Sequence, residues 1–263
     1  MINALRAVIY MVGVEATTYP LEWLERSVGL LLLGAIAVFG APFFDAIGGQ
    51  HVDISYASYV LVALAVLQLF DAVLTRFQSR LRNQQLAGVL EICLTTRTPF
   101  WQYVLALPAF DMLTALLQST ALFALAIHLG DVGIEWGRLA VALVILCIGV
   151  ASYAMLGLIA AAGILIYKRG DPVTKVVHLA ALIFGGTFFP RSVLPDWLAT
   201  LGGWLPIAPT LDSMRTLLFT SEPLADGTWY RLIIILAVTA VVAIPTFRYS
   251  LVRARRDGSL SHY

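Results

Sequence analysis

The chain has 263 residues, of which 60% are hydrophobic and 13% are charged, and its mean hydropathy is +0.85. Soluble domains carry about 25% charged residues, so this composition excludes an ordinary soluble domain and predicts a membrane protein. The formal net charge of +1 argues against nucleic acid as a partner, because phosphate binding needs clustered cations.

The N-terminal segment, residues 1–26, predicts an amphipathic helix on the membrane surface. Its apolar residues recur at helical spacing: they are Ile2, Leu5, Val8, Ile9 and Val12. A secretory signal peptide is less consistent with the sequence, because the apolar run is short, Glu15 follows it and no A-x-A cleavage pattern appears.

Apolar stretches that approach the length of a membrane span follow along the rest of the chain. A helix needs about 20 apolar residues to cross the hydrocarbon core. We expect spans over 27–47, 56–76, 100–128, 138–167, 174–190 and 230–250. The fifth is short and ends in GGTFFP, where Gly185 and Gly186 suit a sharp break, so whether it crosses fully is left open. The fold class predicted is an all-α integral membrane protein with six transmembrane helices.

Basic residues predict the orientation of these spans. Most of them lie in the N-terminal segment, in the connections after the second and fourth spans, and in the C-terminal tail. They are Arg6, Arg26, Arg76, Arg80, Arg82, Arg97, Lys168, Arg169, Lys175, Arg248, Arg253, Arg255 and Arg256. Because cytoplasmic loops carry the excess of Lys and Arg, both termini and the connection 77–99 are expected in the cytoplasm.

That connection contains the stretch QQLAGVLEICLTTRTP, which predicts a short amphipathic helix. An apolar stripe at helical spacing runs along it: Leu86, Val89, Leu90, Cys93 and Leu94. Thr98 suits an N-cap and Pro99 the first position of the next helix. The helix either rests on lipid with Glu91 solvated or presses against a partner; periodicity alone leaves both interpretations open.

The same stretch resembles the cytoplasmic segment of the ABC-2 type family of ABC-transporter permeases, which often reads E-x-G-T-L-E-x-L-L-x-T-P. The matching residues are Gly88, Leu90, Glu91, Leu94, Thr98 and Pro99. It departs from the pattern at Val89, which stands in place of Thr, and in an extra Thr-Arg before Thr98.

A second region, 185–219, is similar to the family pattern F-P-x-x-x-L-P-x-W/L followed by N-P-L-x-x-x-x-[DE]-x-x-R. The matching residues are Phe189, Pro190, Leu194, Pro195, Trp197, Pro206, Asp212 and Arg215. Leu205 replaces the usual Asn, and Pro209 is unusual. Independently of the family, the three-residue spacing of Asp212 and Arg215 would let them pair on one helix face.

The resemblance implies a single ABC-2 type transmembrane domain over 1–263, with an interfacial helix at 1–26, a coupling segment at 77–99 and short re-entrant helices within 190–229. It implies a homodimer, or a pair with a similar subunit, bound to two cytoplasmic ABC ATPase subunits in a bacterial inner membrane. The residues implied at the ATPase contact are Leu86, Gly88, Leu90, Glu91, Leu94, Thr98 and Pro99.

This chain itself is not expected to be an enzyme or to bind a cofactor. It contains no G-x-x-x-x-G-K-[ST] motif, so ATP and Mg²⁺ would be held by the partner subunit. Its cysteines, Cys93 and Cys147, lie in different settings, and its histidines are scattered, so neither a disulfide nor a metal site is predicted.

Polar residues within the predicted spans are the other candidates for function. Asp111 would lie about eleven residues into the third span, roughly 16 Å deep and near the midplane. Thr114 and Gln118 share its face, and Gln68 of the second span could meet them. These groups either line a translocation path or hold helices together by hydrogen bonds.

Two backbone features are also expected in the third and fourth spans. Pro108 is expected to kink the third span, and Gly157 with Ala161 forms a small-xxx-small pair that favours close packing of the fourth span.

The predicted function is that of the permease subunit of an ATP-driven exporter. It would move an amphipathic substrate, such as a drug, natural product or lipid, from the cytoplasm or inner leaflet outward. One alternative is export of a lipid-linked polysaccharide by the same architecture. An alternative from another class is an ion-coupled carrier or channel that uses Asp111 as its ion site.

Overall fold

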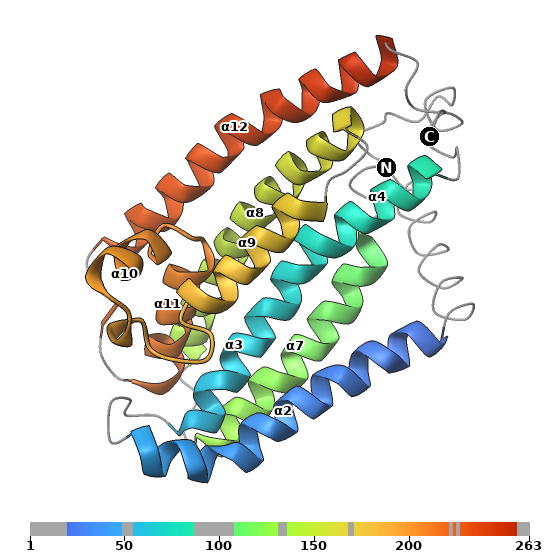
Figure 1. The fold of residues 1–263 in the computed structure, drawn as a ribbon. Helices are drawn as coiled ribbons and strands as arrows, with labels where there is room; N and C mark the ends of the chain where they lie inside the picture. Colours follow the sequence, from blue (N-terminus) through green and yellow to red (C-terminus); the bar gives the residue numbers. More distant parts are fainter. Residues whose placement is uncertain are drawn as a thin grey trace.

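The computed structural model describes residues 20–48, 55–86, 108–130, 136–167, 171–220, 223–224 and 227–256, and the regular elements in these ranges are all helical (Figure 1). The longer helices are α2 (Pro20–Gly48), α3 (Tyr56–Asp71), α4 (Phe77–Leu86), α7 (Ala109–Leu129), α8 (Trp136–Tyr167), α9 (Asp171–Phe184) and α12 (Thr228–Arg256). The shorter elements are η1 (Ala72–Arg76), η2 (Arg191–Val193), α10 (Asp196–Gly202) and α11 (Ile207–Phe219).

The helices form one bundle with two distinct ends. α4 and α12 finish at one end, which we call the α4 end, and η2, α10 and α11 gather at the opposite end, which we call the α10 end (Figure 1). Residues 1–19 and 87–107 lie outside the described residues, and with them most of the predicted interfacial helix and of the predicted coupling segment. Of the coupling residues, Leu86 marks the end of α4.

Four helices are long and apolar enough to cross a membrane. They are Tyr56–Gln84, Ala109–Leu129, Trp136–Ile164 and Thr228–Arg253. These agree with the second, third, fourth and sixth predicted spans, and the chain is therefore a multi-pass membrane protein. The apolar parts of α2 and α9 are shorter, Ser27–Pro42 and Thr174–Phe184, so six crossings remain a prediction.

The helix that runs through α3, η1 and α4 is the centre of the bundle. Within its apolar stretch 83% of the residues are buried, whereas the other three candidate spans have between 22% and 33% buried. α3 packs against α2, α7 and α11, and α8 packs against α12. The outer helices expose large apolar side chains such as Phe39 and Val241, as expected for helices in contact with lipid.

A π-helical turn, η1, interrupts this central helix. Such turns are rare and often accompany functional sites. Gly157 of α8 packs directly against η1, because a Cβ at this position would overlap the carbonyl oxygen of Val73. The predicted close packing at Gly157 is therefore confirmed.

The start of the third predicted span, residues 100–107, lies outside the described residues. In the described part of the chain this helix begins at Ala109, with Pro108 as its N-cap residue. Pro108 thus precedes the first residue of α7, a place that suits a residue with no N–H to donate. Asp111 lies in the first turn of α7. The predicted kink at Pro108 and the predicted depth of Asp111 depend on residues 100–107, which lie outside the described residues, so both stay predictions.

The break predicted after the fifth apolar segment is confirmed. α9 ends at Phe184, and Gly186 adopts a positive φ of 76°, a conformation that glycine adopts without steric cost. The chain then forms η2, α10 and α11 before α12 begins.

Candidate functional site

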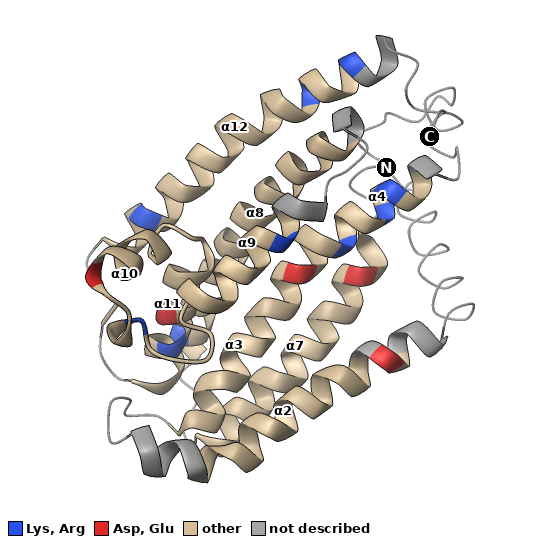
Figure 2. Cartoon of the chain, viewed as in Figure 1, with Lys and Arg blue, Asp and Glu red and all other residues tan. Residues whose placement is uncertain are grey.

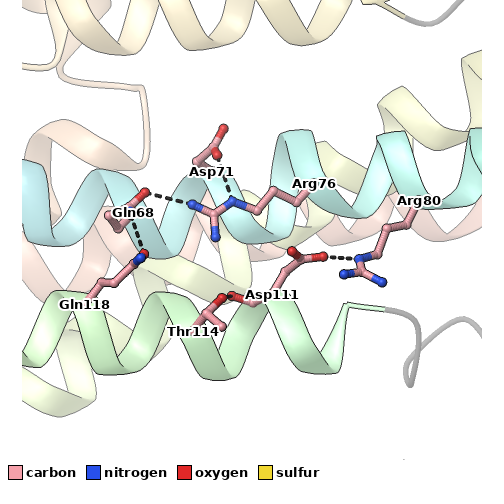
Figure 3. Close-up of polar contacts among 7 residues, drawn as sticks. All are labelled: Gln68, Asp71, Arg76, Arg80, Asp111, Thr114 and Gln118. Carbon is pink, nitrogen blue, oxygen red and sulfur yellow. Dashed lines mark hydrogen bonds and ion pairs between the residues drawn. The ribbon is translucent and has the colours of Figure 1, made fainter. Parts of the chain in front are cut away.

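Polar side chains from α2, α3, η1, α4 and α7 lie in the half of the bundle that faces the α4 end, where hydrogen bonds join them into two groups. Figure 3 shows all of them except Ser27. We call this set the inner polar network. Its members are Ser27, Gln68, Asp71, Arg76, Arg80, Asp111, Thr114 and Gln118. It includes every residue that the sequence predicted for a polar strip, together with partners that the sequence did not single out.

The two glutamines join three helices. Gln68 Nε2 of α3 donates to Gln118 Oε1 of α7 at 2.6 Å, and Gln118 Nε2 donates to the Ser27 hydroxyl of α2 at 3.0 Å. The predicted meeting of Gln68 with the α7 strip is therefore observed at Gln118. Both amides are engaged in contacts between helices, which is the geometry expected of groups that hold spans together.

Arg76, the last residue of η1, connects the glutamines to a carboxylate. Its Nε donates to Asp71 Oδ2 at 3.1 Å and its Nη2 donates to Gln68 Oε1 at 2.9 Å (Figure 3). Its Nη1 is buried and has no hydrogen-bond partner among the described residues. The arginine thus fixes the side chains of Asp71 and Gln68 on the same face of the central helix.

Arg80 and Asp111 form the ion pair that joins α4 to α7. Arg80 Nε donates to Asp111 Oδ2, and the Asp111 side chain is completely buried while that of Arg80 is 23% exposed. The Arg80 guanidinium also lies over the Phe110 ring, 5.9 Å from its centroid. An unpaired buried carboxylate would cost several kcal/mol, so Arg80 supplies the countercharge that makes burial of Asp111 tolerable.

Thr114 contributes less to the network than its spacing suggested. Its hydroxyl donates to the backbone oxygen of Asp111 at 3.0 Å, within the same helix. It is therefore satisfied locally, as threonine in a helix commonly is.

A second polar cluster lies at the α10 end around Arg215 of α11, which is 6% exposed. Arg215 Nη1 donates to the Gly186 carbonyl at 2.9 Å, and Nη2 donates to the carbonyls of Tyr59 at 3.0 Å and Thr187 at 3.4 Å. The guanidinium carbon lies 3.3 Å from the centroid of the Tyr59 ring, and the Tyr59 hydroxyl donates to the Gly186 carbonyl at 2.8 Å. One side chain thus ties α11 to the start of α3 and to the break after α9.

Arg215 remains charged in this environment. α11 lies outside the candidate spans, and burial lowers the pKa of the Arg215 guanidinium to about 10, while its interactions with Tyr59 and Asp212 act in the opposite direction. At neutral pH the bonds to the carbonyls are therefore charge-assisted, which makes them about twice as strong as neutral ones.

The predicted pairing of Asp212 with Arg215 is wrong. Asp212 pairs instead with Arg191 of η2, and its side chain is 44% exposed. The reason is that Arg215 faces the core, where it satisfies carbonyl groups of the α9 break that have no helical partner, while Asp212 faces the surface.

The other residues of the predicted outer motif occupy helix starts and surfaces. Pro195 and Pro206 are the N-cap residues of α10 and α11. Trp197 is 65% exposed on α10, and Phe189 and Pro190 are half-buried just before η2. Exposed tryptophan on a short helix is typical of the membrane interface.

An apolar cavity of about 770 Å³ lies between α3, α7, α8 and α11, and the sequence did not predict it. The only hint of it in the sequence is the presence of small residues at positions that line its wall, such as Ala124 and Ala142. Within the described part of the chain, no three His, Cys, Asp or Glu side chains gather to hold a metal ion.

Comparison with protein families identifies the architecture. The family described as ABC-2 type transporter matches residues 27–219, which run from α2 to the end of α11 and include both polar clusters. The chain belongs to the ABC-2 type transporter family. It is thus a membrane permease component of an ABC transporter, and permease domains of this family generally work with an ABC ATPase. No curated protein sequence matches the chain.

Proposed function

We propose that this ABC-2 permease is the membrane subunit of an ATP-driven exporter that moves an amphipathic molecule from the cytoplasm or inner leaflet outward. It would act as a homodimer with two cytoplasmic ATPase subunits, which bind and hydrolyse ATP, in a bacterial inner membrane. α2 and α9 would complete six crossings, and α10 and α11 would form the re-entrant region of the outer face.

The distribution of charge supports this orientation. α4 and the last turns of α12 carry basic residues at the α4 end (Figure 2), among them Arg80, Arg82 and Arg253. The connections from α4 to α7 and from α8 to α9 add Arg97, Lys168 and Arg169. By the positive-inside rule the α4 end faces the cytoplasm.

The observation that carries the proposal is the ion pair between Arg80 and Asp111. Arg80 lies less than two helical turns before Leu86, where α4 leads into the predicted coupling segment. Because Asp111 is buried and bound to Arg80, a displacement of that segment by an ATPase would move the start of α7 together with α4. Gln68, Gln118 and Ser27 then extend the connection to α2.

The same pair weighs against an ion-coupled carrier. An ion site needs a carboxylate that can exchange its partner, whereas Asp111 has a fixed countercharge from within the chain. The hydroxyl groups of a polysaccharide need polar partners along the path. Because Gln68 and Gln118 are hydrogen-bonded to each other, they favour an amphipathic cargo over a polysaccharide.

The proposal is tested by co-purification with the cognate ATPase, followed by ATPase and transport assays in liposomes. We expect Leu90→Asp to abolish assembly, because it places a charge in the apolar contact, and Glu91→Ala to permit assembly but lower substrate-stimulated ATPase activity. Glu25→Ala, which removes an exposed carboxylate of α2, is the matched control and should behave as the unaltered chain. If both coupling variants assemble and hydrolyse ATP normally, the assignment of the segment is wrong.

A further inference from the structure

The apolar cavity is lined mainly by α7 and α8 and reaches the surface of the bundle. Along α7 it is lined from Leu116 to His128, a rise of about 18 Å, and one leaflet of a bilayer has about 15 Å of hydrocarbon. Leu116 and Leu143 on its wall are 45% and 53% exposed, so the cavity reaches the outer surface of the bundle between two candidate spans.

Among the described residues, the hydroxyl groups of the deep part of the cavity already donate to backbone carbonyls. Ser119 donates its hydroxyl to the Ala65 carbonyl and Thr120 donates to the Leu116 carbonyl, each at 2.7 Å. The remaining wall there is apolar, with Leu69, Phe123 and Leu146 among its members. A polar headgroup would therefore be unsatisfied in this part, whereas an acyl chain would not.

The polar groups lie at the other end of the cavity, near the ends of α7 and α8. His128 is exposed in the last turn of α7 and lines the cavity. Arg138, in the first turns of α8, donates to the Thr216 carbonyl at 3.0 Å, and Thr216 lies between Met214 and Leu218, which both line the cavity. Trp136 is 78% exposed at the start of α8, as is usual for tryptophan at headgroup level.

We propose that this cavity binds one acyl chain of a membrane phospholipid, with the phosphate of the headgroup held beside Arg138 and His128. The gradient from a mouth with polar groups to an apolar interior matches the polarity of such a lipid, and the volume lies within the range of about 300–1,000 Å³ found for ligand pockets. The position of the mouth assigns the lipid to the outer leaflet; that assignment of the leaflet rests on the orientation in the proposed function.

The test uses the full chain in nanodiscs that contain a phosphatidylglycerol with a photoactivatable diazirine near the end of one acyl chain. After irradiation, labelled residues are identified by mass spectrometry. Ala142 and Leu146 line the cavity and are 0% and 8% exposed, whereas their neighbour Ile145 is 0% exposed and does not line it. Bulk lipid reaches none of these three buried side chains, so only a chain inside the cavity can label them. We therefore expect labelling of Ala142 and Leu146, which line the cavity, but not of Ile145, which does not.

Two tryptophan variants on α7 sharpen the test. Ala124→Trp fills the cavity and displaces the equivalent of at least two methylene groups, which should lower labelling of Leu146 about tenfold. Ala121→Trp is the matched control, because Ala121 is exposed on the same helix but does not line the cavity, and it should leave labelling unchanged. The proposal is overturned if Leu146 is labelled no more strongly than Ile145. A second copy of the chain that covers the cavity would give the same result. Persistence of the label in Ala124→Trp overturns it as well.

The headgroup is tested with a diacylglycerol that carries the same diazirine chain. It lacks the phosphate and should label Leu146 several-fold less than the phospholipid does; equal labelling overturns the assignment of the phosphate to Arg138 and His128. The experiment needs neither ATPase nor ATP, so its failure counts against the lipid site alone. Failure of the coupling variants counts against the proposed function alone.

Discussion

The two ends of the bundle are held by different kinds of polar contact. At the α10 end, Arg215 donates to three backbone carbonyls and is almost completely buried. In the inner polar network near the α4 end, side chains bind other side chains, as in the pairs Arg80–Asp111 and Gln68–Gln118. The contacts of Arg215 hold the course of the main chain itself, whereas those of the inner polar network join one helix to another through side chains alone.

This difference indicates which end can respond to a partner. The α10 end is a fixed framework in which one arginine joins α3, α11 and the break after α9. The inner polar network lies close to the point where α4 leads toward the predicted ATPase contact, and its side-chain pairs join neighbouring helices there. We therefore expect substitutions at the α10 end to affect stability first and substitutions in the inner network to affect coupling first.

The largest loss of stability is expected from Arg215→Ala. It removes the guanidinium donor from the buried carbonyls of Gly186, Tyr59 and Thr187, of which Gly186 keeps the Tyr59 hydroxyl. Each buried group that is left unsatisfied costs about 1–3 kcal/mol. The melting temperature in detergent should fall by about 10 °C, using a conversion of ~2–4 °C per kcal/mol. Arg215→Lys should recover only part of this loss, because one ammonium group cannot reproduce the planar fork.

Arg191→Ala is the control at the same end. Asp212, its partner, is 44% exposed, and exposed pairs contribute about 0–1 kcal/mol. A melting temperature as low as that of Arg215→Ala would show that the cluster depends on the surface pair and not on the buried arginine.

A smaller loss is expected where α8 packs against η1. Gly157→Ala should lower the free energy of unfolding by about 1–3 kcal/mol, because the added Cβ overlaps the backbone oxygen of Val73, which cannot move aside alone. Gly163→Ala on the same helix is the matched control. It meets open space and should be neutral or stabilising by up to ~1 kcal/mol, so equal losses in the two variants would contradict the close packing at η1.

The smallest effect is expected from the glutamine pair. A double-mutant cycle of Gln68→Leu and Gln118→Leu, read by thermal unfolding, should give an interaction energy of about 0.6 kcal/mol, which is typical of hydrogen bonds between transmembrane helices. The same cycle with Gln68→Leu and Thr246→Val should be additive, because Thr246 is a half-buried residue of α12 whose hydroxyl donates within its own helix. Additivity of the glutamine cycle as well would remove this contact from the network.

Much of the helical plan could be predicted from hydropathy alone, because a span is a local property of about 20 residues. The contact of Gln68 with Gln118 could also be anticipated, since Gln118 shares a helix face with Asp111 and Gln68 lies midway along the neighbouring span. The break at Gly185 and Gly186 was likewise readable, because glycine before a Phe-Phe-Pro run marks a turn.

The remaining features depend on register between segments that are distant in sequence. The pair of Arg80 with Asp111 follows from how α4 lies beside the first turn of α7, and no local pattern in the sequence specifies that register. Arg215 looked like the partner of Asp212 because the carbonyls that it satisfies belong to α3 and to the break after α9. The π-helical turn of η1 has no signature in composition, since it adds one residue to an otherwise regular helix.

The central claim is that the Arg80–Asp111 pair joins α4 rigidly to α7 and so passes movement from the ATPase contact to the spans. It is tested most directly with Arg80→Cys and Asp111→Cys combined in a chain whose Cys93 and Cys147 are replaced by serine, reconstituted with the ATPase. We predict that the reduced protein hydrolyses ATP but does not transport, and that a short, reducible methanethiosulfonate cross-linker between the two cysteines restores transport. Transport at the full rate without the cross-linker, or none with it, would contradict the claim.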